Sequence, residues 1–199
     1  MAKTPVTPAV VDFKQFKWLV RLDAGVVLHA GELTPEPISV PVGDAQKIVT
    51  SVVRRVLDLP RNSSPEVVWS LGDSELLVHS DRTKIACSSG VVTFSVEVEC
   101  DQCDRIAVRV PIGVGTSKSP SGLVMSTFSD LEGPVAIVQT WSDSIKAFAW
   151  ETLLETASVI TSQVGKDAQG RALVPGNIAA APDRLLIQPV ARQTLSVGA

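Results

Sequence analysis

The chain of 199 residues contains no tyrosine, only two histidines and only three cysteines. The lack of tyrosine excludes a phenol as nucleophile, general acid or hydrogen-bond anchor. The two histidines, His29 and His79, are too few for a three-histidine metal site, and a Ser–His–Asp triad would have to use one of them. These counts leave little material for catalysis.

Neither histidine comes with the other residues that nucleophilic catalysis needs. His79 is predicted on the polar face of a β-sheet, beside Lys84 or Ser95, where a histidine is normally solvated. A triad also requires a serine or cysteine next to the imidazole and an acidic group that orients it, and the sequence does not assemble such a trio. We therefore expect no catalytic residue, no cofactor and no enzymatic activity.

Strongly basic segments are missing as well. The chain has 18 Lys and Arg against 21 Asp and Glu, a formal net charge of −3. Nucleic-acid binders normally carry a basic stripe. The most basic stretch, at the N-terminus, spreads its positive charges in a way that is typical of a solvated surface. Nucleic acid is therefore not an expected partner.

Long hydrophobic runs are also absent. No stretch approaches the roughly 18 apolar residues of a membrane span. The first residues do not read as a secretory signal, because Pro5, Pro8, Asp12 and Lys14 interrupt their short apolar run. An odd number of cysteines without such a signal indicates reduced thiols. The sequence thus predicts a cytoplasmic protein with no membrane partner.

What the sequence does contain is ordinary material for a globular core, with 45% hydrophobic and 20% charged residues. The length fits one domain. Proline-containing or apolar ends flank it, and we expect an N-terminal arm over residues 1–15, a single α+β domain over 16–190 and a C-terminal arm over 191–199. Within the domain, residues 18–31 predict a β-hairpin and residues 32–43 an extended connector.

Alternating apolar residues predict an antiparallel meander of about five strands, over 66–71, 74–80, 83–88, 91–100 and 104–112. Its hairpin turns are placed at Asp81-Arg82 and Ser89-Gly90 and around Asp101–Cys103. Two helices, at about 44–58 and 141–164, are expected to cover its apolar face, with Asp44 and Thr140 as N-caps and Gly165 at the second C-terminus. Short strands are predicted at 135–139 and 185–188. The predicted fold class is α+β.

Cys100 and Cys103 form the one pair with chemical promise, because two cysteines two residues apart at a hairpin tip can build a zinc knuckle or a redox dithiol. The predicted register places Cys87 opposite Val92, eight residues from Cys100, or roughly 26 Å along an extended strand. His79 is predicted in the same distant zone. We therefore expect no metal site within one chain, and any metal would be bound by Cys100 and Cys103.

The segment Gly113–Ser119 has a glycine-rich look that invites comparison with a phosphate-binding loop. In that motif a glycine directly precedes the lysine and a helix follows. Here Ser117 precedes Lys118, and Pro120 and Gly122 continue the loop. A flexible connector is the better interpretation.

These observations favour a non-catalytic structural or assembly protein that binds copies of itself or other protein subunits. The candidate interface residues are the apolar residues of the two arms: Pro5, Val10, Val11, Phe13, Leu195 and Val197. Two alternatives remain open. One is a thiol- or zinc-dependent module that uses Cys100 and Cys103, and the other is an adaptor that binds a peptide by strand addition at the edge strand 66–71.

Overall fold

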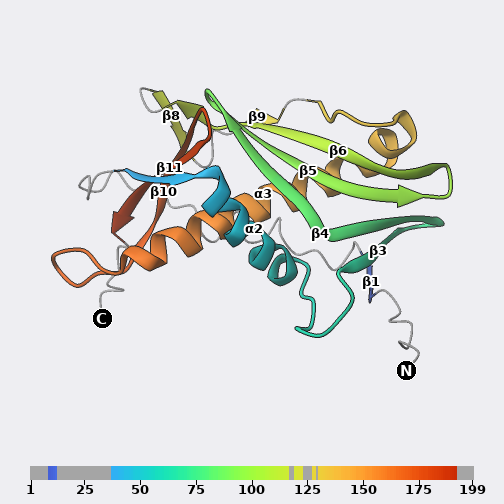
Figure 1. Ribbon diagram of the computed structural model, residues 1–199, viewed down its shortest axis with the longest axis horizontal. Helices are drawn as coiled ribbons and strands as arrows, with labels where there is room; N and C mark the ends of the chain where they lie inside the picture. Colours follow the sequence, from blue (N-terminus) through green and yellow to red (C-terminus); the bar gives the residue numbers. More distant parts are fainter. Residues whose placement is uncertain (1–8, 13–36, 117–118, 123–126, 129, 192–199) are drawn as a thin grey trace, which may run out of the picture.

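The computed structural model describes residues 9–12, 37–116, 119–122, 127–128 and 130–191, which form two helices and two β-sheets (Figure 1). Sheet A has the strand order β1-β3-β4-β5-β6-β9 and sheet B the order β2-β11-β10-β8-β7. The bounds in sheet A are β1 Ala9–Asp12, β3 Glu66–Leu71, β4 Ser74–Ser88, β5 Val91–Cys100, β6 Cys103–Gly113 and β9 Thr127–Phe128. Those in sheet B are β2 Ile38–Pro41, β7 Gly115–Thr116, β8 Ser119–Gly122, β10 Leu173–Ala181 and β11 Arg184–Ala191. The α+β class with an antiparallel meander is thereby confirmed.

The register of the meander is as predicted for its later strands. Ile85 lies opposite Phe94, and Phe94 lies opposite Val110. Alternate residues of β5 are fully buried while those between them are partly exposed. This alternation is what fixes the pairing, since a slip by one residue would turn the whole apolar set toward solvent.

The predicted hairpin at Asp81-Arg82 is wrong, because β4 is one strand of 15 residues. Between His79, opposite Glu97, and Lys84, opposite Ser95, β4 carries extra residues that bulge out of the ladder. A bulge of this kind and a two-residue turn both change which alternate positions face the core. The alternation of apolar residues therefore could not distinguish a continuous strand from two strands.

Both helices begin earlier than predicted. Helix α2 spans Val42–Val56 and α3 spans Val135–Val164. Pro41 and Pro134 precede them without a side-chain cap, so Asp44 and Thr140 lie inside the helices and are not N-caps. The predicted strand at 135–139 is the first part of α3, since burial of Ile137 in the core outweighs the β-preference of its branched neighbours. Gly165 does end α3, with φ of 94°.

Sheet B contains more of the chain than expected. Residues 173–191 form the hairpin of β10 and β11, whereas only a strand at 185–188 was predicted. The proline-rich connector includes β2, which pairs with β11 at the edge of the sheet, where proline is tolerated. The predicted hairpin at 18–31 and the C-terminal arm beyond Ala191 lie outside the described residues.

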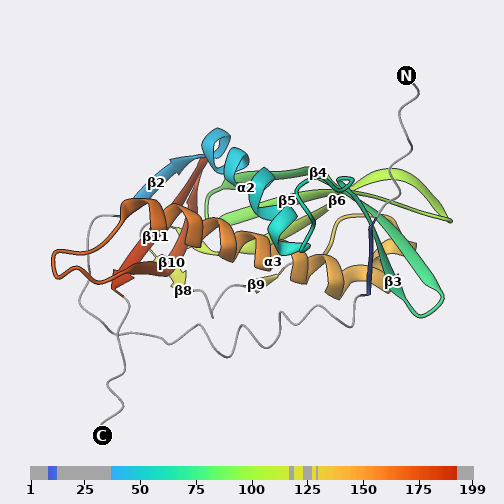
Figure 2. The ribbon, with the colours of Figure 1, turned by 90° about the horizontal axis from the view of Figure 1, so that it is seen from below.

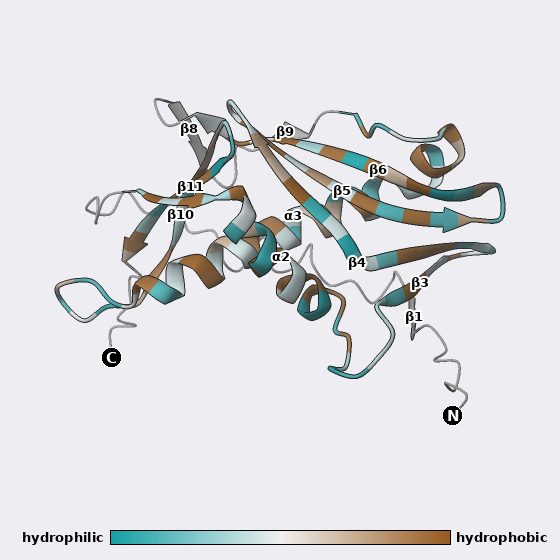
Figure 3. Cartoon of the chain, viewed as in Figure 1, coloured by the Kyte–Doolittle hydropathy of each residue, from teal (hydrophilic) through white to brown (hydrophobic). Residues whose placement is uncertain are grey.

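The core lies between sheet A and α3. Trp69 of β3 packs against Phe148 with ring centroids 5.6 Å apart and against Trp141 at 6.4 Å. Helix α3 runs the length of the molecule, across one face of sheet A and on to sheet B (Figure 2). The hydropathy colouring shows brown alternating with teal along β4, β5 and β6 (Figure 3). No described helix is long and apolar enough to cross a membrane.

The two sheets meet at the β4–β5 turn. The backbone N–H of Gly90 donates to the carbonyl of Ala180 at 2.9 Å, and that of Asp183 donates to the carbonyl of Cys87 at 3.2 Å. Gly90 has φ of 77°, which a residue without a side chain adopts at little cost. These bonds join the β4–β5 turn of sheet A to the β10–β11 turn of sheet B.

Candidate functional site

The structure places Cys100 and Cys103 directly opposite each other at the tip of the β5–β6 hairpin. Asp101 and Gln102 form a two-residue turn between them, and a register shift separates this last pair from Val98. Both thiols are free and partly exposed. Cys87 lies opposite Val92 at the other end of β5, as predicted, so the three cysteines do not meet.

The environment of these thiols does not favour the thiolate. Burial, the adjacent Cys100 and the charge of Asp104 raise the pKa of Cys103. Burial and the charge of Asp183 raise the pKa of Cys87 to about 11. Reactive cysteines in enzymes have the opposite property, a lowered pKa beside positive charge or a helix N-terminus. Neither thiol is therefore an activated nucleophile.

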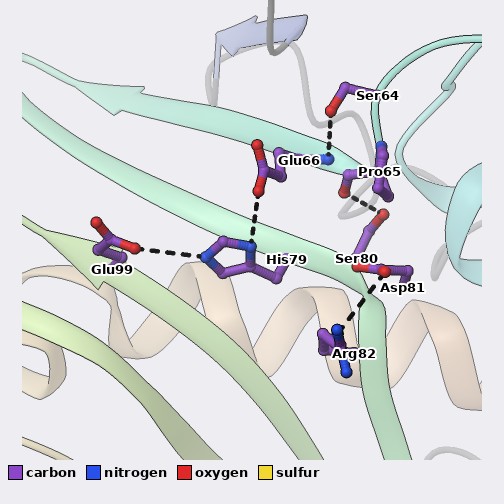
Figure 4. Close-up of polar contacts among 8 residues, drawn as sticks. All are labelled: Ser64, Pro65, Glu66, His79, Ser80, Asp81, Arg82 and Glu99. Atoms are coloured by element: carbon purple, nitrogen blue, oxygen red, sulfur yellow. Dashed lines mark hydrogen bonds and ion pairs between the residues drawn. The ribbon is translucent and has the colours of Figure 1, made fainter. Parts of the chain in front are cut away.

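His79 differs from the prediction in both position and exposure. Because β4 is continuous, His79 lies opposite Glu97 in the part of sheet A near the Cys100 tip, and it is only 2% exposed. Its Nδ1 lies 3.4 Å from a carboxylate oxygen of Glu66 and its Nε2 lies 3.7 Å from one of Glu99. Figure 4 shows the imidazole between these two side chains, which come from β3 and β5.

The contacts of His79 span three strands, from β3 through β4 to β5. Each ring nitrogen of His79 lies within 4 Å of a carboxylate oxygen, and Nε2 has no hydrogen-bond partner among the described residues. Within the described ranges, no group of three or more His, Cys, Asp and Glu residues could hold a metal ion. The acidic residues on the polar positions of β3 and β5 were visible in the sequence. They could be joined to His79 only after β4 was known to be continuous.

The glycine-rich segment also takes a form other than a connector. Gly115 and Thr116 form β7, which pairs with β8, and β8 pairs with β10 in sheet B. Among the described residues the next element after β8 is the strand β9, whereas a phosphate-binding loop is followed by a helix. Residues 117–118 lie outside the described part of the chain.

The edge of β3 is the most informative feature for function. β1, from the predicted N-terminal arm, pairs with β3 in parallel, with Ala9 opposite Val67 and Asp12 opposite Ser70. It is the only parallel pairing among the described strands. We call the outer side of Val67–Ser70 the β3 edge. It is the strand that the peptide-adaptor hypothesis proposed as free, and here a segment of the chain itself occupies it.

The part of β4 that extends beyond β3 is a second strand edge, and a side chain covers it. β3 pairs only with residues 74–79 of β4, so the rest of β4 continues beyond it. There Gln46 of α2 donates from Nε2 to the carbonyl of Thr83 and accepts from the N–H of Ile85 through Oε1, both at 2.9 Å. The amide of Gln46 thus satisfies two backbone groups as a neighbouring strand would. Sequence reasoning missed this role because no local pattern links residues 37 or more positions apart.

The candidate interface residues are only partly placed. Val10 and Val11 belong to β1, opposite Val68 and Trp69. Pro5, Phe13, Leu195 and Val197 lie outside the described residues. Of the predicted interface, the structure therefore places one short segment, and it places that segment at a sheet edge.

The chain defines an α+β protein with a meander sheet whose open edge receives an N-terminal strand. No family model, no curated protein and no solved structure matches it.

Proposed function

We propose that the protein is a non-catalytic structural subunit that assembles with copies of itself, and that its N-terminal strand takes part in the assembly. The observation that carries the proposal is the parallel pairing of β1 with the β3 edge. A strand added to an edge supplies backbone hydrogen bonds regardless of its sequence, and the register of its side chains adds specificity.

The length of chain behind β1 suits this role. Residues 13–37 separate β1 from β2, and a segment of that length can reach about 80 Å when extended. β1 can therefore pair with the β3 edge of its own subunit or with that of a neighbouring subunit. Exchange of an identical element between subunits is a low-cost route to oligomers, because the contacts already exist within one chain.

The placement of the reactive side chains supports a structural role over a catalytic one. The Cys100–Cys103 pair lies at a hairpin tip, Cys87 lies at the opposite end of β5, and the ring nitrogens of His79 lie beside Glu66 and Glu99. A catalytic centre would bring a nucleophile and a base within hydrogen-bonding distance.

Light scattering and negative-stain imaging of the purified chain test the proposal. We expect particles well above the 21.1 kDa of one chain. The double variant Val10→Pro, Val11→Pro should release monomers, because proline donates no N–H to a ladder. The matched variant Val10→Thr, Val11→Thr keeps β-preference and all N–H groups, and it should assemble like the wild type.

A monodisperse 21.1 kDa monomer at all accessible concentrations would contradict the proposal. If the proline variant instead captures added peptides of the sequence around Val10 and the wild-type chain stays monomeric, the β3 edge is an adaptor site with β1 as its occupant. Assembly that persists unchanged in the proline variant would show that β1 has no part in it.

A further inference from the structure

A second feature, independent of the assembly proposal, lies at the tip of the β5–β6 hairpin. This tip projects at the end of sheet A opposite to sheet B (Figure 1). Cys100 and Cys103 are cross-strand partners there, with only Asp101 and Gln102 between them. The two thiols are therefore the last paired residues of the hairpin.

The geometry of such a pair suits a covalent bond between the sulfurs. Directly opposite residues of an antiparallel ladder have Cα atoms about 4.5–5.5 Å apart. Disulfides join cysteines whose Cα atoms are about 4.4–6.8 Å apart. Both cysteines are partly exposed, so a small oxidant can reach them. Cys87 is buried and lies at the far end of β5, so it cannot compete.

We propose that Cys100 and Cys103 are a redox couple that closes to an intramolecular disulfide when the protein meets a two-electron oxidant such as hydrogen peroxide. In the first step one thiolate attacks a peroxide oxygen, the O–O bond breaks, and the cysteine becomes a sulfenic acid with release of water. In the second step the other thiol attacks that sulfur, the S–S bond forms, and a second water leaves. A dithiol reductant returns both thiols.

The surroundings of the pair determine how it behaves. Burial, Cys100 and Asp104 raise the pKa of Cys103, so the thiolate fraction at neutral pH is small. Closure should therefore be slow near neutrality and faster as the pH rises. Because closure is slow, the couple should respond to sustained oxidation and should not act as a catalytic oxidoreductase.

Treatment of the full-length protein with hydrogen peroxide tests this proposal. Under denaturing conditions the count of free thiols should fall from three to one. The intact mass should fall by two hydrogen atoms, and a non-reduced digest should contain one peptide pair linked through Cys100 and Cys103. Cys87→Ser should behave alike, with two thiols falling to none, whereas Cys103→Ser should form no internal disulfide. A dithiol reductant should reverse every change.

Three results would overturn the proposal. They are unchanged thiol counts under excess peroxide, oxidation that stops at separate oxygen adducts on the two cysteines, and disulfides formed only between copies. Failure of this test leaves the assembly proposal untouched, because Cys100 and Cys103 are remote in sequence from Val10 and Val11.

Discussion

The buried threonines of α3 differ in whether their hydroxyl groups are hydrogen-bonded. Thr152, Thr156 and Thr161 are all fully buried, and they lie four and five residues apart along the helix. The hydroxyl of Thr161 donates to the carbonyl of Ala157 at 2.8 Å. The hydroxyls of Thr152 and Thr156 have no hydrogen-bond partner among the described residues. A buried threonine hydroxyl therefore stabilises the fold at position 161, where it is hydrogen-bonded, and destabilises it at positions 152 and 156, where it is not.

Replacing the unpartnered hydroxyls should stabilise the protein. Thr152→Val or Thr156→Val exchanges a buried hydroxyl for a methyl group of similar size, and each should raise the free energy of unfolding by about 1 kcal/mol or more. Thr161→Val removes a satisfied hydrogen bond and should lower it by about 1 kcal/mol. Urea unfolding curves of the three variants measure the differences. A loss of stability in Thr152→Val would contradict the assignment of an unsatisfied hydroxyl.

A pH-dependent residue lies in the turn after α3. Burial alone would raise the pKa of Asp167, but hydrogen bonds from the backbone and side chain of Arg171, its positive charge and the N–H of Gln169 lower the pKa overall. The Nε of Arg171 lies 2.6 Å from Oδ2 of Asp167. Because the folded-state pKa lies below the unfolded value of 3.8, the carboxylate stabilises the fold above that value. This contribution is lost as the pH falls through the folded-state pKa.

Asp167→Asn should therefore be less stable than the wild type at pH 7, and the difference should shrink as the pH falls below 3.8 and vanish below the folded-state pKa. Denaturant unfolding at a series of pH values measures it. Asp73→Asn, which removes an exposed carboxylate in the β3–β4 turn, serves as the control and should show little difference at either end. An equal deficit of Asp167→Asn at pH 7 and at pH 2 would show that its role is not electrostatic.

At the scale of elements, sheet A depends on how its edges are covered. The β3 edge is paired with β1, and the part of β4 beyond β3 is sealed by Gln46 from α2. Open edges invite pairing with other chains, and proteins protect them with strands, helices or charges. Here one edge is covered by a side chain from a helix and the other is paired with β1.

Loss of the Gln46 amide should weaken the protein and expose β4. Gln46→Ala leaves the carbonyl of Thr83 and the N–H of Ile85 without this partner, at a cost of about 1–3 kcal/mol. Gln46→Glu can still accept from Ile85 but cannot donate to Thr83, so it should also lose stability. Ser51→Ala, on the exposed side of α2, is the control. Thermal unfolding measures stability, and light scattering near Tm measures aggregation; unchanged curves for Gln46→Ala would contradict the sealing role.

The elements also show what the sequence could predict. Strands β5 and β6 alternate apolar and polar residues without interruption, and both their bounds and their register were predicted closely. The prediction for β4 was wrong because the alternation of apolar residues around its bulge is the same as around a turn. The predicted start of α3 was wrong because the branched residues at 135–138 favour a strand locally. At the candidate site, the position of Cys100 and Cys103 at a hairpin tip was predicted, but the loop was predicted to include Cys103, whereas Cys103 pairs with Cys100 across a two-residue turn. The burial of His79 and the role of Gln46 depend on contacts between distant segments.

At the scale of the whole molecule, α3 is the element that both sheets share. All residues from 147 to 153 are buried, so every face of this part of α3 is covered. The cover comes from sheet A, α2 and sheet B, which pack around the helix. Two backbone hydrogen bonds, one from the N–H of Gly90 and one from the N–H of Asp183, also join the two sheets. The sequence predicted a helix here and its cover of the meander, but it did not predict a second sheet around the same helix.

The shared helix has a consequence for how the protein comes apart. Neither sheet can lose its packing surface without stripping one side of α3, so the two sheets should unfold as a single cooperative unit. β1 is paired with sheet A through the β3 edge, and we expect it to separate from this unit. We therefore expect a core that opens globally and a four-residue strand that detaches while the rest stays folded. Amide hydrogens in β1 would then exchange by local fraying, and those in β5 and β11 only by rare global opening.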